Sequence, residues 1–438
     1  MLCRELDWVE PGAAFRALAA HAPLVFLDSA ATGDPRAATS YIALDQLTVL
    51  RLNKACELPP WLEAARPQDD VCPPDWPFAF KGGAIGWLGY EAGLAQAGIA
   101  SRHEPISGLT PGWFGMFDLV LGFDHVTKRC FALAADRPGE SAAQRIAALA
   151  ARLASPGGFP ALPKLEWQAE LPRPDYEAGV ERLRAYIAAG DVYQANFTTR
   201  FTAPRPPGFN PAACHAALRA RSPAPFGAFI DTGVGVALCS ASPERFLSVQ
   251  ADGHVEARPI KGTAPRHADP VRDAASAAAL RADPKERAEN LMITDLLRND
   301  LGRVCAFGSV QVPELFSVES FAQAHHLVSA VTGQLRPGVE AADLLLAAFP
   351  GGSITGAPKH RAMQIIDELE EGPRGAYCGA IAWIGLDGAM DSSIIIRTIT
   401  ATPDTLYAQA GGGITWDSSP ASEYDEMMLK LSPLIAHG

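Results

Sequence analysis

Strand-like apolar runs come in clusters along this sequence and do not alternate one by one with helical segments. Between residues 1 and 135 such runs are separated by Gly and Pro: PLVFLDSA, YIALDQ, GWFGMFDLVLGFD and RCFALAAD. A second set follows: PFGAFIDTG, VALCSASPERFLSV, HVEARPI, GAYCGAIAWIGL, SSIIIRTITAT and TLYAQAGGGI. Consecutive strands favour antiparallel meanders, whereas a doubly wound parallel sheet requires strict alternation with helices. The pattern therefore predicts an α+β fold with large antiparallel sheets.

Six other segments have the composition or spacing of helices. They are residues 141–154, 175–191, about 272–298, 340–348, 358–370 and 421–432. Between the first two, SPGGFPALP (155–163) contains too many Pro and Gly residues to continue either helix. We therefore predict a boundary there, with an N-terminal subdomain over 1–165 and a larger domain over 166–438.

The bulk composition disfavours nucleic-acid and membrane partners. The 438 residues carry a formal net charge of −12, so an anion would need a locally positive site in an acidic molecule. None of the eight cysteines forms a C-x-x-C pair, which is typical of reduced thiols. The N-terminus MLCRELDWVE lacks an apolar signal region, and no uninterrupted apolar run approaches the roughly 18–20 residues that span a bilayer. We expect a cytoplasmic protein.

Two pairs of glutamates have the i,i+3 spacing that places both side chains on one helix face. Glu286 and Glu289 lie in KERAENLMITDLLRND, and Glu423 and Glu426 lie in SSPASEYDEMMLK. Either pair is also compatible with an ordinary solvated helix face. Each pair, however, is flanked by apolar residues, and four carboxylates would repel one another without a cation. Oxygen ligands with no His or Cys cluster point to Mg²⁺, which would keep positions open for water and a substrate carboxylate.

Several further residues are suited to binding an anion, although each has a purely structural alternative. Gly412 and Gly413, in AGGGITW, allow close backbone approach and outward amide groups, but triple glycines are often turns. Arg397 lies in a β-branched run, where it either faces water or pairs with an anion in a cleft. Ser353 precedes a predicted helix start and either caps that helix or contacts an anion. His326 and Tyr377 are compatible with structural roles as well.

The order of these segments resembles the chorismate-utilising enzymes, which include anthranilate synthase, aminodeoxychorismate synthase, isochorismate synthase and salicylate synthase. The resemblance is densest over about 172–435 and is carried by VYQANFTTR, SPERF, RPIKGTAPR, ENLMITDLLRNDLGRV, HHLVSAVTG, FPGGSITGAPK, YCGAIAW, SSIIIRT and AGGGITWDSSPASEYDEMMLK. The N-terminal part is similar more loosely, through FLDSA and PFAFKGGAIGWLGYE. The resemblance implies the chorismate-binding fold, in which large, mostly antiparallel sheets pack as a sandwich with helices outside.

One residue within the resemblance distinguishes between branches of the family. The segment around Lys261 reads PIKGT here, whereas anthranilate synthases usually carry PIAGT and isochorismate synthases commonly carry a small residue. A lysine at this position resembles the aminodeoxychorismate synthase branch, component I, which makes 4-amino-4-deoxychorismate for p-aminobenzoate and folate synthesis. Gln194 stands where the water-using relatives carry a lysine base, and this also argues against isochorismate or salicylate synthase.

The resemblance also implies roles for individual residues. Lys261 would be a covalent nucleophile, Glu244 a general acid, and His326 a neighbour of the ring and of the departing C4 hydroxyl. The pocket and chorismate carboxylates would be contacted by Arg397, Lys430, Gly412, Gly413, Tyr377, Ser353, Gln194 and Thr263. The Mg²⁺ ligands would be Glu289 and Glu426, supported by Glu286 and Glu423.

No glutaminase-type G-x-C-x-G nucleophile is found in the sequence, so the resemblance implies ammonia delivery by a separate glutamine amidotransferase subunit. We expect the reaction to stop at aminodeoxychorismate. Two alternative functions are also compatible with the sequence. Anthranilate synthase component I would share the anion-binding and metal residues but release an aromatic product. A non-catalytic relative would bind chorismate and Mg²⁺ without turnover.

FLDSA and the later SYI resemble the region that binds tryptophan in relatives. Asp28, Ser29 and Tyr41 would line that site, with Asp28 standing where the pattern often has Glu or His. In anthranilate synthases this region is a feedback site, whereas in aminodeoxychorismate synthases a bound tryptophan would be structural.

Overall fold

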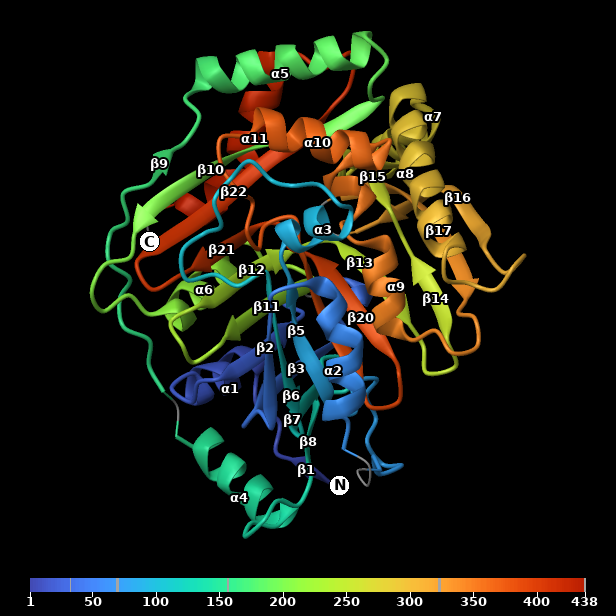
Figure 1. The fold of residues 1–438 in the computed structure, drawn as a ribbon. Helices are drawn as coiled ribbons and strands as arrows, with labels where there is room; N and C mark the ends of the chain where they lie inside the picture. Colours follow the sequence, from blue (N-terminus) through green and yellow to red (C-terminus); the bar gives the residue numbers. More distant parts are fainter. Residues whose placement is uncertain (32, 68–70, 156, 322–323, 437–438) are drawn as a thin grey trace.

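The protein is described here from a computed structural model that covers residues 1–438 except 32, 68–70, 156, 322–323 and 437–438. Two large antiparallel sheets form its centre, and helices lie around them (Figure 1). Buried side chains of both sheets belong to the same hydrophobic clusters, as Phe26 and Ile42 of one sheet and Leu88 and Phe114 of the other illustrate. This arrangement confirms the predicted α+β class.

The first sheet has twelve strands, and all their pairings within the described chain are antiparallel. Eleven form a continuous order and the short β9 (Gln168–Ala169) pairs with β10. In spatial order the strands are β1 (Leu2–Leu6), β8 (Arg129–Ala134), β7 (Leu119–Asp124), β3 (Thr39–Leu44), β2 (Leu24–Asp28), β11 (Phe226–Asp231), β12 (Ala237–Ser242), β21 (Thr398–Ala401), β22 (Thr405–Ile414), β10 (Gln194–Pro204) and β18 (Gly356–Ala357).

The second sheet has ten strands and is also antiparallel throughout the described residues. β16 (Gln311–Ser320) pairs with β17 beside the main order. That order is β15 (Ile260–Pro265), β17 (Ala324–Gln334), β14 (His254–Ala257), β13 (Arg245–Val249), β20 (Met390–Ile394), β19 (Ala380–Gly385), β5 (Gly83–Leu88), β6 (Gly112–Phe117) and β4 (Thr48–Leu52). β15 is thus an edge strand.

Three runs that the sequence predicts as single strands are each divided between the two sheets, so the prediction of single strands is wrong there. Residues 112–124 form β6 and β7, with Asp118 between them; 236–249 form β12 and β13; and 392–402 form β20 and β21. The physical reason is local at two of the crossings. Asp118 is buried and ion-paired to Arg145, and Arg397 takes a positive φ of 52°, which ends regular strand geometry.

The predicted helices are present, but the stretch at 272–298 is two helices. Asp283 ends α7 (Pro270–Ala282), accepts hydrogen bonds from the backbone N–H groups of Lys285 and Glu286, and so begins α8 (Pro284–Gly302). The other predicted helices are α4 (Ala142–Leu153), α5 (Arg173–Ala188), α9 (Ala341–Ala348), α10 (Lys359–Leu369) and α11 (Pro420–Ile435). Further helices that the sequence pattern did not predict are α1 (Pro11–Leu18), α2 (Leu58–Ala65), α3 (Tyr90–Gln96), α6 (Pro211–Arg221) and the 3₁₀ turns η1 (Pro35–Ala37), η2 (Ala55–Glu57) and η3 (Gly352–Ile354).

The predicted boundary near residue 165 falls in the connection between α4 and β9. Strands from both sides of it hydrogen-bond within each sheet: β2 pairs with β11, and β5 pairs with β19. The division into two domains stays a prediction.

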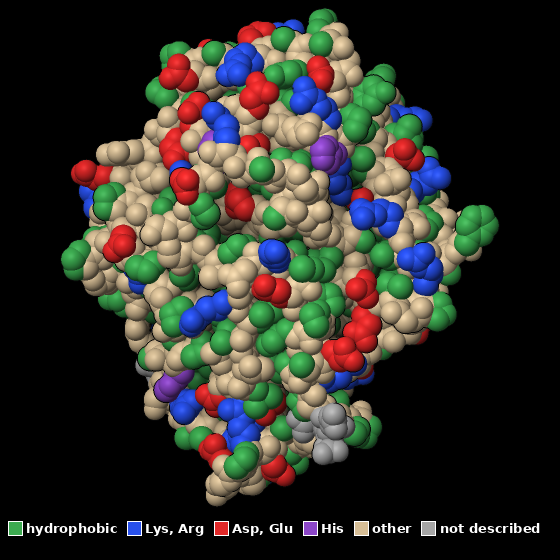
Figure 2. Space-filling model, in the orientation of Figure 1, with side chains coloured by type: hydrophobic (Ala, Val, Ile, Leu, Met, Phe, Trp, Pro, Cys, Tyr) green, Lys and Arg blue, Asp and Glu red, His purple; other side chains and the backbone are tan. Residues whose placement is uncertain are grey.

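Surface charge and helix hydropathy are the properties related to nucleic-acid and membrane binding. On the face seen in Figure 2, Lys and Arg side chains are interspersed with Asp and Glu and do not form one basic field. Among the residues that the structure describes, none of the helices has the length and apolar character needed to cross a bilayer.

Candidate active site

A pocket of about 290 Å³ opens where the chain crosses between the sheets. Its walls come from β10, β15, β22, η3, α11 and the two crossings that follow β12 and β20. Nine of the fifteen residues proposed for catalysis, substrate binding and metal binding line it: Glu244, Lys261, Thr263, Ser353, Tyr377, Arg397, Gly412, Gly413 and Lys430. Segments far apart in the sequence therefore supply one site.

Lys261 reaches this pocket because β15 contains a bulge. Ile260 pairs with Val328 and Thr263 with His326, so β15 has one more residue than β17 between these pairs. Gly262 has a φ of +83°, the left-handed conformation that such bulges assign to glycine. A Cβ at Gly262 would also lie 2.9 Å from Glu286 Oε2. Because of the bulge at Lys261 and Gly262, the lysine side chain points from the edge strand β15 into the pocket.

The amine of Lys261 is only loosely engaged by the protein. Its Nζ lies 3.9 Å from Oε2 of Glu289, and the side chain is 20% exposed. That separation is at the outer limit of an ion pair and beyond hydrogen-bonding distance. The nitrogen is therefore available to a ligand in the pocket.

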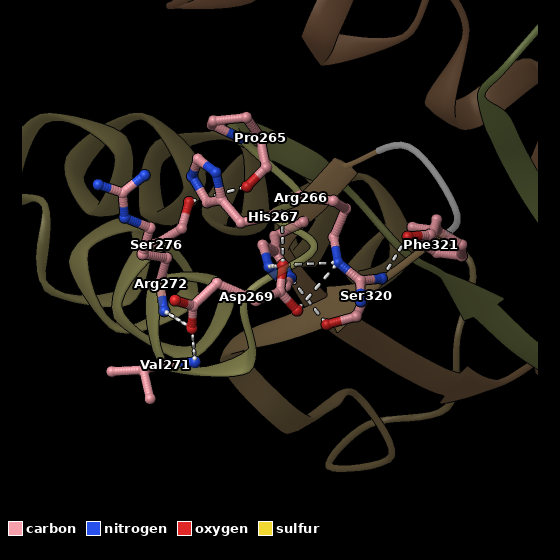
Figure 3. A network of polar contacts seen from close by, with 11 residues as sticks. Pro265, Arg266, His267, Asp269, Val271, Arg272, Ser276, Ser320 and Phe321 are labelled. Atoms are coloured by element: carbon pink, nitrogen blue, oxygen red, sulfur yellow. Dashed lines mark hydrogen bonds and ion pairs between the residues drawn. The ribbon is translucent and has the colours of Figure 1, made fainter.

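A network of polar contacts anchors the end of β15 beyond Lys261 (Figure 3). Asp273 of α7 accepts from Nε of Arg266 at 2.9 Å and lies 3.0 Å from Nε2 of the buried His325. The other ring nitrogen of His325 is 2.8 Å from the Ser320 hydroxyl, and Arg266 also donates to the carbonyl of Phe321. These contacts join β15 to α7, β16 and β17.

Glu244 lies at the crossing between β12 and β13 and is held by Ser353. The Ser353 hydroxyl donates to Oε1 of Glu244 at 2.8 Å. Burial raises the pKa of the Glu244 carboxyl, although Ser353 and Lys261 act in the opposite direction. A carboxyl that stays protonated to higher pH is suited to donating a proton.

His326 lies behind Thr263 and does not itself line the pocket. Its Nδ1 is 3.1 Å from the Thr263 hydroxyl. Burial and then Arg36 lower the pKa of the imidazole, which favours its neutral form. The geometry therefore favours Glu244 over His326 as the group that gives up a proton.

Three features of the pocket are suited to an anion. The guanidinium of Arg397 makes no hydrogen bond or ion pair with any described residue, and burial lowers its pKa. Lys430 Nζ contacts Oε1 of Glu426 at 2.7 Å and donates to the carbonyl of Gly411 at 3.0 Å. The backbone at Gly412 and Gly413 also lines the pocket, and Gly413 packs closely on Gln194, since a Cβ at 413 would lie 2.1 Å from Nε2 of that side chain. An unpaired, half-buried Arg in a pocket is a strong indication of an anionic ligand.

We expect Arg397→Gln to raise the KM for the anionic substrate about 10- to 100-fold, the equivalent of one lost charge-assisted hydrogen bond. Steady-state kinetics measure this KM. The matched control is Arg361→Gln on α10, whose guanidinium pairs with Asp191 at 2.9 Å outside this pocket. An equal change in both variants would contradict the assignment.

The four glutamates lie as two pairs on α8 and α11 beside the pocket, and none of them is among its lining residues. Burial and then Glu289 raise the pKa of Glu286; burial also raises the pKa of Glu423, and Glu426 acts in the same direction. Within the described chain, no group of three or more His, Cys, Asp or Glu is placed to hold a metal. The type of donor is nevertheless compatible with Mg²⁺, because all four carboxylates offer hard oxygens whose repulsion a cation would relieve.

Two polar side chains of the pocket were not predicted as site residues. Asn196, on β10, is 9% exposed, and its Oδ1 has no hydrogen-bond partner among the described residues. Gln409, on β22, lines the same pocket. The period-two alternation along VYQANF places Asn196 on the same side as Gln194, and this was the signal that could have found it.

The residues predicted for a tryptophan site line a different cavity, of about 100 Å³, together with Arg245 and Asp391. Asp28 is buried, pairs with Arg219 at 2.8 Å, and has a pKa that burial raises to about 6. The Ser29 hydroxyl donates to the carbonyl of Pro225 at 2.9 Å. Drug-sized ligands usually occupy roughly 300–1,000 Å³, so an amino acid as large as tryptophan would require this cavity to widen.

The sequence and the structure are similar to those of known proteins. The chain matches the family described as chorismate binding enzyme over residues 25–436. The chain belongs to this family. Among its relatives, aminodeoxychorismate synthase component 1 of Klebsiella aerogenes is 46% identical over 356 residues, covering 81% of this chain and 77% of that protein.

Two other similar proteins are anthranilate synthases. Anthranilate synthase component 1 of Streptomyces coelicolor is 39% identical over 374 residues, covering 81% of this chain and 72% of that protein. The crystal structure of anthranilate synthase component I from Streptococcus pneumoniae superposes with a TM-score of 0.79 at 30% identity, covering 91% of this chain and 92% of the other. The predicted family and fold are thereby confirmed.

Proposed function

We propose that this chorismate-binding enzyme is an aminodeoxychorismate synthase component 1, which converts chorismate and ammonia to 4-amino-4-deoxychorismate. The observation that carries the proposal is Lys261, whose amine the β15 bulge presents to the pocket. The identity of 46% to the Klebsiella aerogenes enzyme supports it. Relatives named anthranilate synthase component 1 are also similar, at lower identity. Identification of the product therefore decides between the two enzymes.

Chorismate binding requires that two carboxylates leave water. Arg397 and Lys430 supply cationic partners in the pocket, and the backbone at Gly412 and Gly413 allows close approach. Glu289 and Glu426, supported by Glu286 and Glu423, would hold Mg²⁺. A bound Mg²⁺ would neutralise substrate charge and orient a carboxylate.

The residues of this chain then supply a nucleophile and an acid. The Lys261 amine attacks C2 of the ring, the double bonds shift, and the C4–O bond breaks as Glu244 gives its proton to the departing hydroxyl, which leaves as water. The lysine nitrogen keeps its protons as the C–N bond forms and becomes a secondary ammonium. Ammonia attacks C4, the double bonds shift back, and the C2–N bond breaks to release the neutral Lys261 amine. The ammonium formed at C4 gives one proton to the Glu244 carboxylate, which restores the acid. Two displacements return the nitrogen to the face that the hydroxyl left.

The direct test incubates the purified chain with chorismate, MgCl₂ and ammonium chloride and identifies the product by mass spectrometry. We expect aminodeoxychorismate, which an added aminodeoxychorismate lyase converts to p-aminobenzoate. Fluorescent anthranilate formed without lyase would instead assign the chain to anthranilate synthase. Chorismate binding without turnover would identify a non-catalytic relative.

We expect Glu244→Gln to lower kcat about 10²- to 10⁴-fold, the usual contribution of a general acid. Because the acid form is the active one and the pKa is raised, wild-type kcat should fall as pH rises through that raised pKa. A pH–kcat profile checks both statements, since the alkaline limb should be absent in the Gln variant. An unchanged alkaline limb would remove Glu244 from the acid role.

Two partners complete the proposal. Ammonia would come in the cell from a separate glutamine amidotransferase subunit, which the designation component 1 of the relatives supports. Tryptophan would bind the cavity that Asp28, Ser29 and Tyr41 line. Isothermal titration calorimetry with tryptophan tests the second point. The wild-type chain should bind tryptophan, and the Ser29→Trp variant, whose new side chain fills the cavity, should not.

A further inference from the structure

The polar network around Ser320 (Figure 3) contains a hydroxyl, an imidazole and a carboxylate in series. The Ser320 hydroxyl is 2.8 Å from Nδ1 of His325, and Nε2 of His325 is 3.0 Å from Oδ1 of Asp273. Ser320 ends β16, His325 lies on β17 and Asp273 on α7. A nucleophile within about 2.6–3.2 Å of a base that a third group orients is the geometry of a catalytic triad, which recurs on unrelated folds.

The hydrogen bonds at Asp273 determine which imidazole nitrogen carries the proton. Arg266 and then the backbone N–H of His267 hold the pKa of the Asp273 carboxyl well below its usual range, so this group is a carboxylate that only accepts. Nε2 of His325 therefore donates to Asp273. In the neutral imidazole, Nδ1 is then an acceptor, and the Ser320 hydroxyl donates to it. This tautomer is the one that can remove the serine proton.

Ser320 also lines a cavity of about 360 Å³. This volume is within the range of roughly 300–1,000 Å³ that small organic ligands occupy. The cavity adjoins two others, since it shares Ile260 with the chorismate pocket and shares Arg36, Phe226 and Arg245 with the cavity predicted for tryptophan. The other lining residues are Pro35, Arg258, Glu319, Phe321 and Val328. A nucleophile and a ligand-sized space therefore lie together.

The lining of this cavity suits an aromatic ring that carries a negative charge. Phe226 and Phe321 supply aromatic side chains, and the Arg36 guanidinium lies 4.2 Å from the centre of the Phe321 ring. Arg36 and Arg245 each pair with an aspartate through Nε and Nη2, and Nη1 of each donates to no described residue. A guanidinium has five N–H groups, so both side chains retain donors for negatively charged ligand oxygens.

We propose that Ser320, His325 and Asp273 form a second catalytic centre, which hydrolyses an aryl ester that carries a carboxylate. The Ser320 oxygen attacks the ester carbonyl carbon while its proton passes to Nδ1 of His325. The bond from that carbon to the phenol oxygen breaks, and His325 gives the proton to the departing phenoxide. Water then attacks the acyl carbon, one of its protons passes through His325 to the Ser320 oxygen, and the carboxylic acid leaves. The inference does not depend on the proposed function.

The test uses 4-acetoxybenzoate as the ester, phenyl acetate as its neutral counterpart, and a fluorophosphonate as a covalent probe of the nucleophile. Ser320→Ala removes the nucleophile at an exposed position, and Asp273→Asn removes the orienting carboxylate. Ser276→Ala on α7 is the matched control, because this serine lies in the same network but donates to the carbonyl of Pro265 at 2.9 Å and not to a histidine (Figure 3). Circular dichroism and thermal unfolding verify that each variant is folded.

We expect the wild-type chain to hydrolyse 4-acetoxybenzoate faster than buffer does, with a KM about tenfold below that for phenyl acetate. The fluorophosphonate should label the peptide that contains Ser320, as identified by mass spectrometry. Ser320→Ala should abolish both reactions. Asp273→Asn should slow both about 10²- to 10⁴-fold, the range of a lost general base, and Ser276→Ala should change them by less than about twofold.

Equal labelling and hydrolysis in the wild type and Ser320→Ala, or neither reaction in the wild type, would overturn the inference and leave the network as an anchor of β15 alone. Equal KM values for the two esters would overturn the anionic substrate class. If Asp273→Asn fails to fold, Ser320→Ala decides alone, because its side chain is exposed. Chorismate turnover should be unchanged in Ser320→Ala, so the esterase activity and the proposed function fail independently.

Discussion

Lys261→Ala is expected to lower kcat with ammonia by at least about a thousandfold, because it removes the proposed nucleophile and leaves no free amine in its place. Lys430, the other lysine of the pocket, is engaged by Glu426 at 2.7 Å and by the Gly411 carbonyl. The rate is measured by coupling product to aminodeoxychorismate lyase. Mass spectrometry of wild-type enzyme quenched during turnover should show a mass increase on the peptide that contains Lys261.

The charge-retaining variant Lys261→Arg separates covalent catalysis from electrostatic assistance. A guanidinium keeps the positive charge near Glu289 but is a very weak nucleophile. If Lys261 forms a bond to C2, the Arg variant should be as impaired as the Ala variant while its chorismate KM remains close to that of the wild type. Substantial activity in the Arg variant, or a wild-type rate in the Ala variant with no adduct, would reject the covalent step.

The sequence alone was sufficient for the family, the antiparallel α+β class and most of the pocket. This was so because the pocket is built from short contiguous motifs whose residue types are chemically distinctive, as in PIKGT and SPERF. Local composition could not indicate where a strand changes sheets. The run SSIIIRTITAT has uniform β propensity, and the positive φ at Arg397 that divides it depends on tertiary contacts.

The same limitation explains why Arg374 was missed. An arginine after a helix has no special pattern, and its importance appears only when segments far apart in the chain meet. Arg374 lies in EGPRGAY, but its side-chain partners are Glu370 and the backbone carbonyls of Ile354 and Asn196. No spacing rule could have connected these three segments.

Arg374 lies beneath the chorismate pocket, and its contacts lead to the prediction with the second-largest effect. The side chains of Arg374 and Glu370 are 1% and 6% exposed and are joined by hydrogen bonds of 2.7 and 2.9 Å. The guanidinium also donates to the carbonyls of Ile354 at 2.9 Å and Asn196 at 2.8 Å, which belong to two pocket-lining residues. Arg374 therefore fixes the relative position of η3 and β10 without touching the pocket itself.

We expect Arg374→Leu to lower the free energy of unfolding by about 3–5 kcal/mol, because it leaves the Glu370 carboxylate buried without its counter-ion, although the backbone N–H and hydroxyl of Thr198 still donate to it. The double variant Arg374→Leu/Glu370→Leu should recover much of that loss, since two apolar side chains can replace a buried ion pair. Urea unfolding followed by circular dichroism measures both values. The kcat/KM for chorismate should remain impaired about tenfold or more in the double variant, because the carbonyls of Ile354 and Asn196 still lack their donor.

A second buried ion pair in the same chain supplies the control. Arg145 and Asp118 are 1% and 3% exposed, and Arg145 likewise donates to a backbone carbonyl, that of Ala135, at 2.8 Å. This pair lies at the crossing between β6 and β7 and contributes no residue to the chorismate pocket. Asp118 also pairs with Arg137, so Arg145→Leu should be destabilised less than Arg374→Leu, and its folded fraction should retain the wild-type kcat/KM. A positioning role for Arg374 requires that activity stay low after stability is restored. If the double variant Arg374→Leu/Glu370→Leu also has the wild-type kcat/KM, Arg374 acts on stability alone.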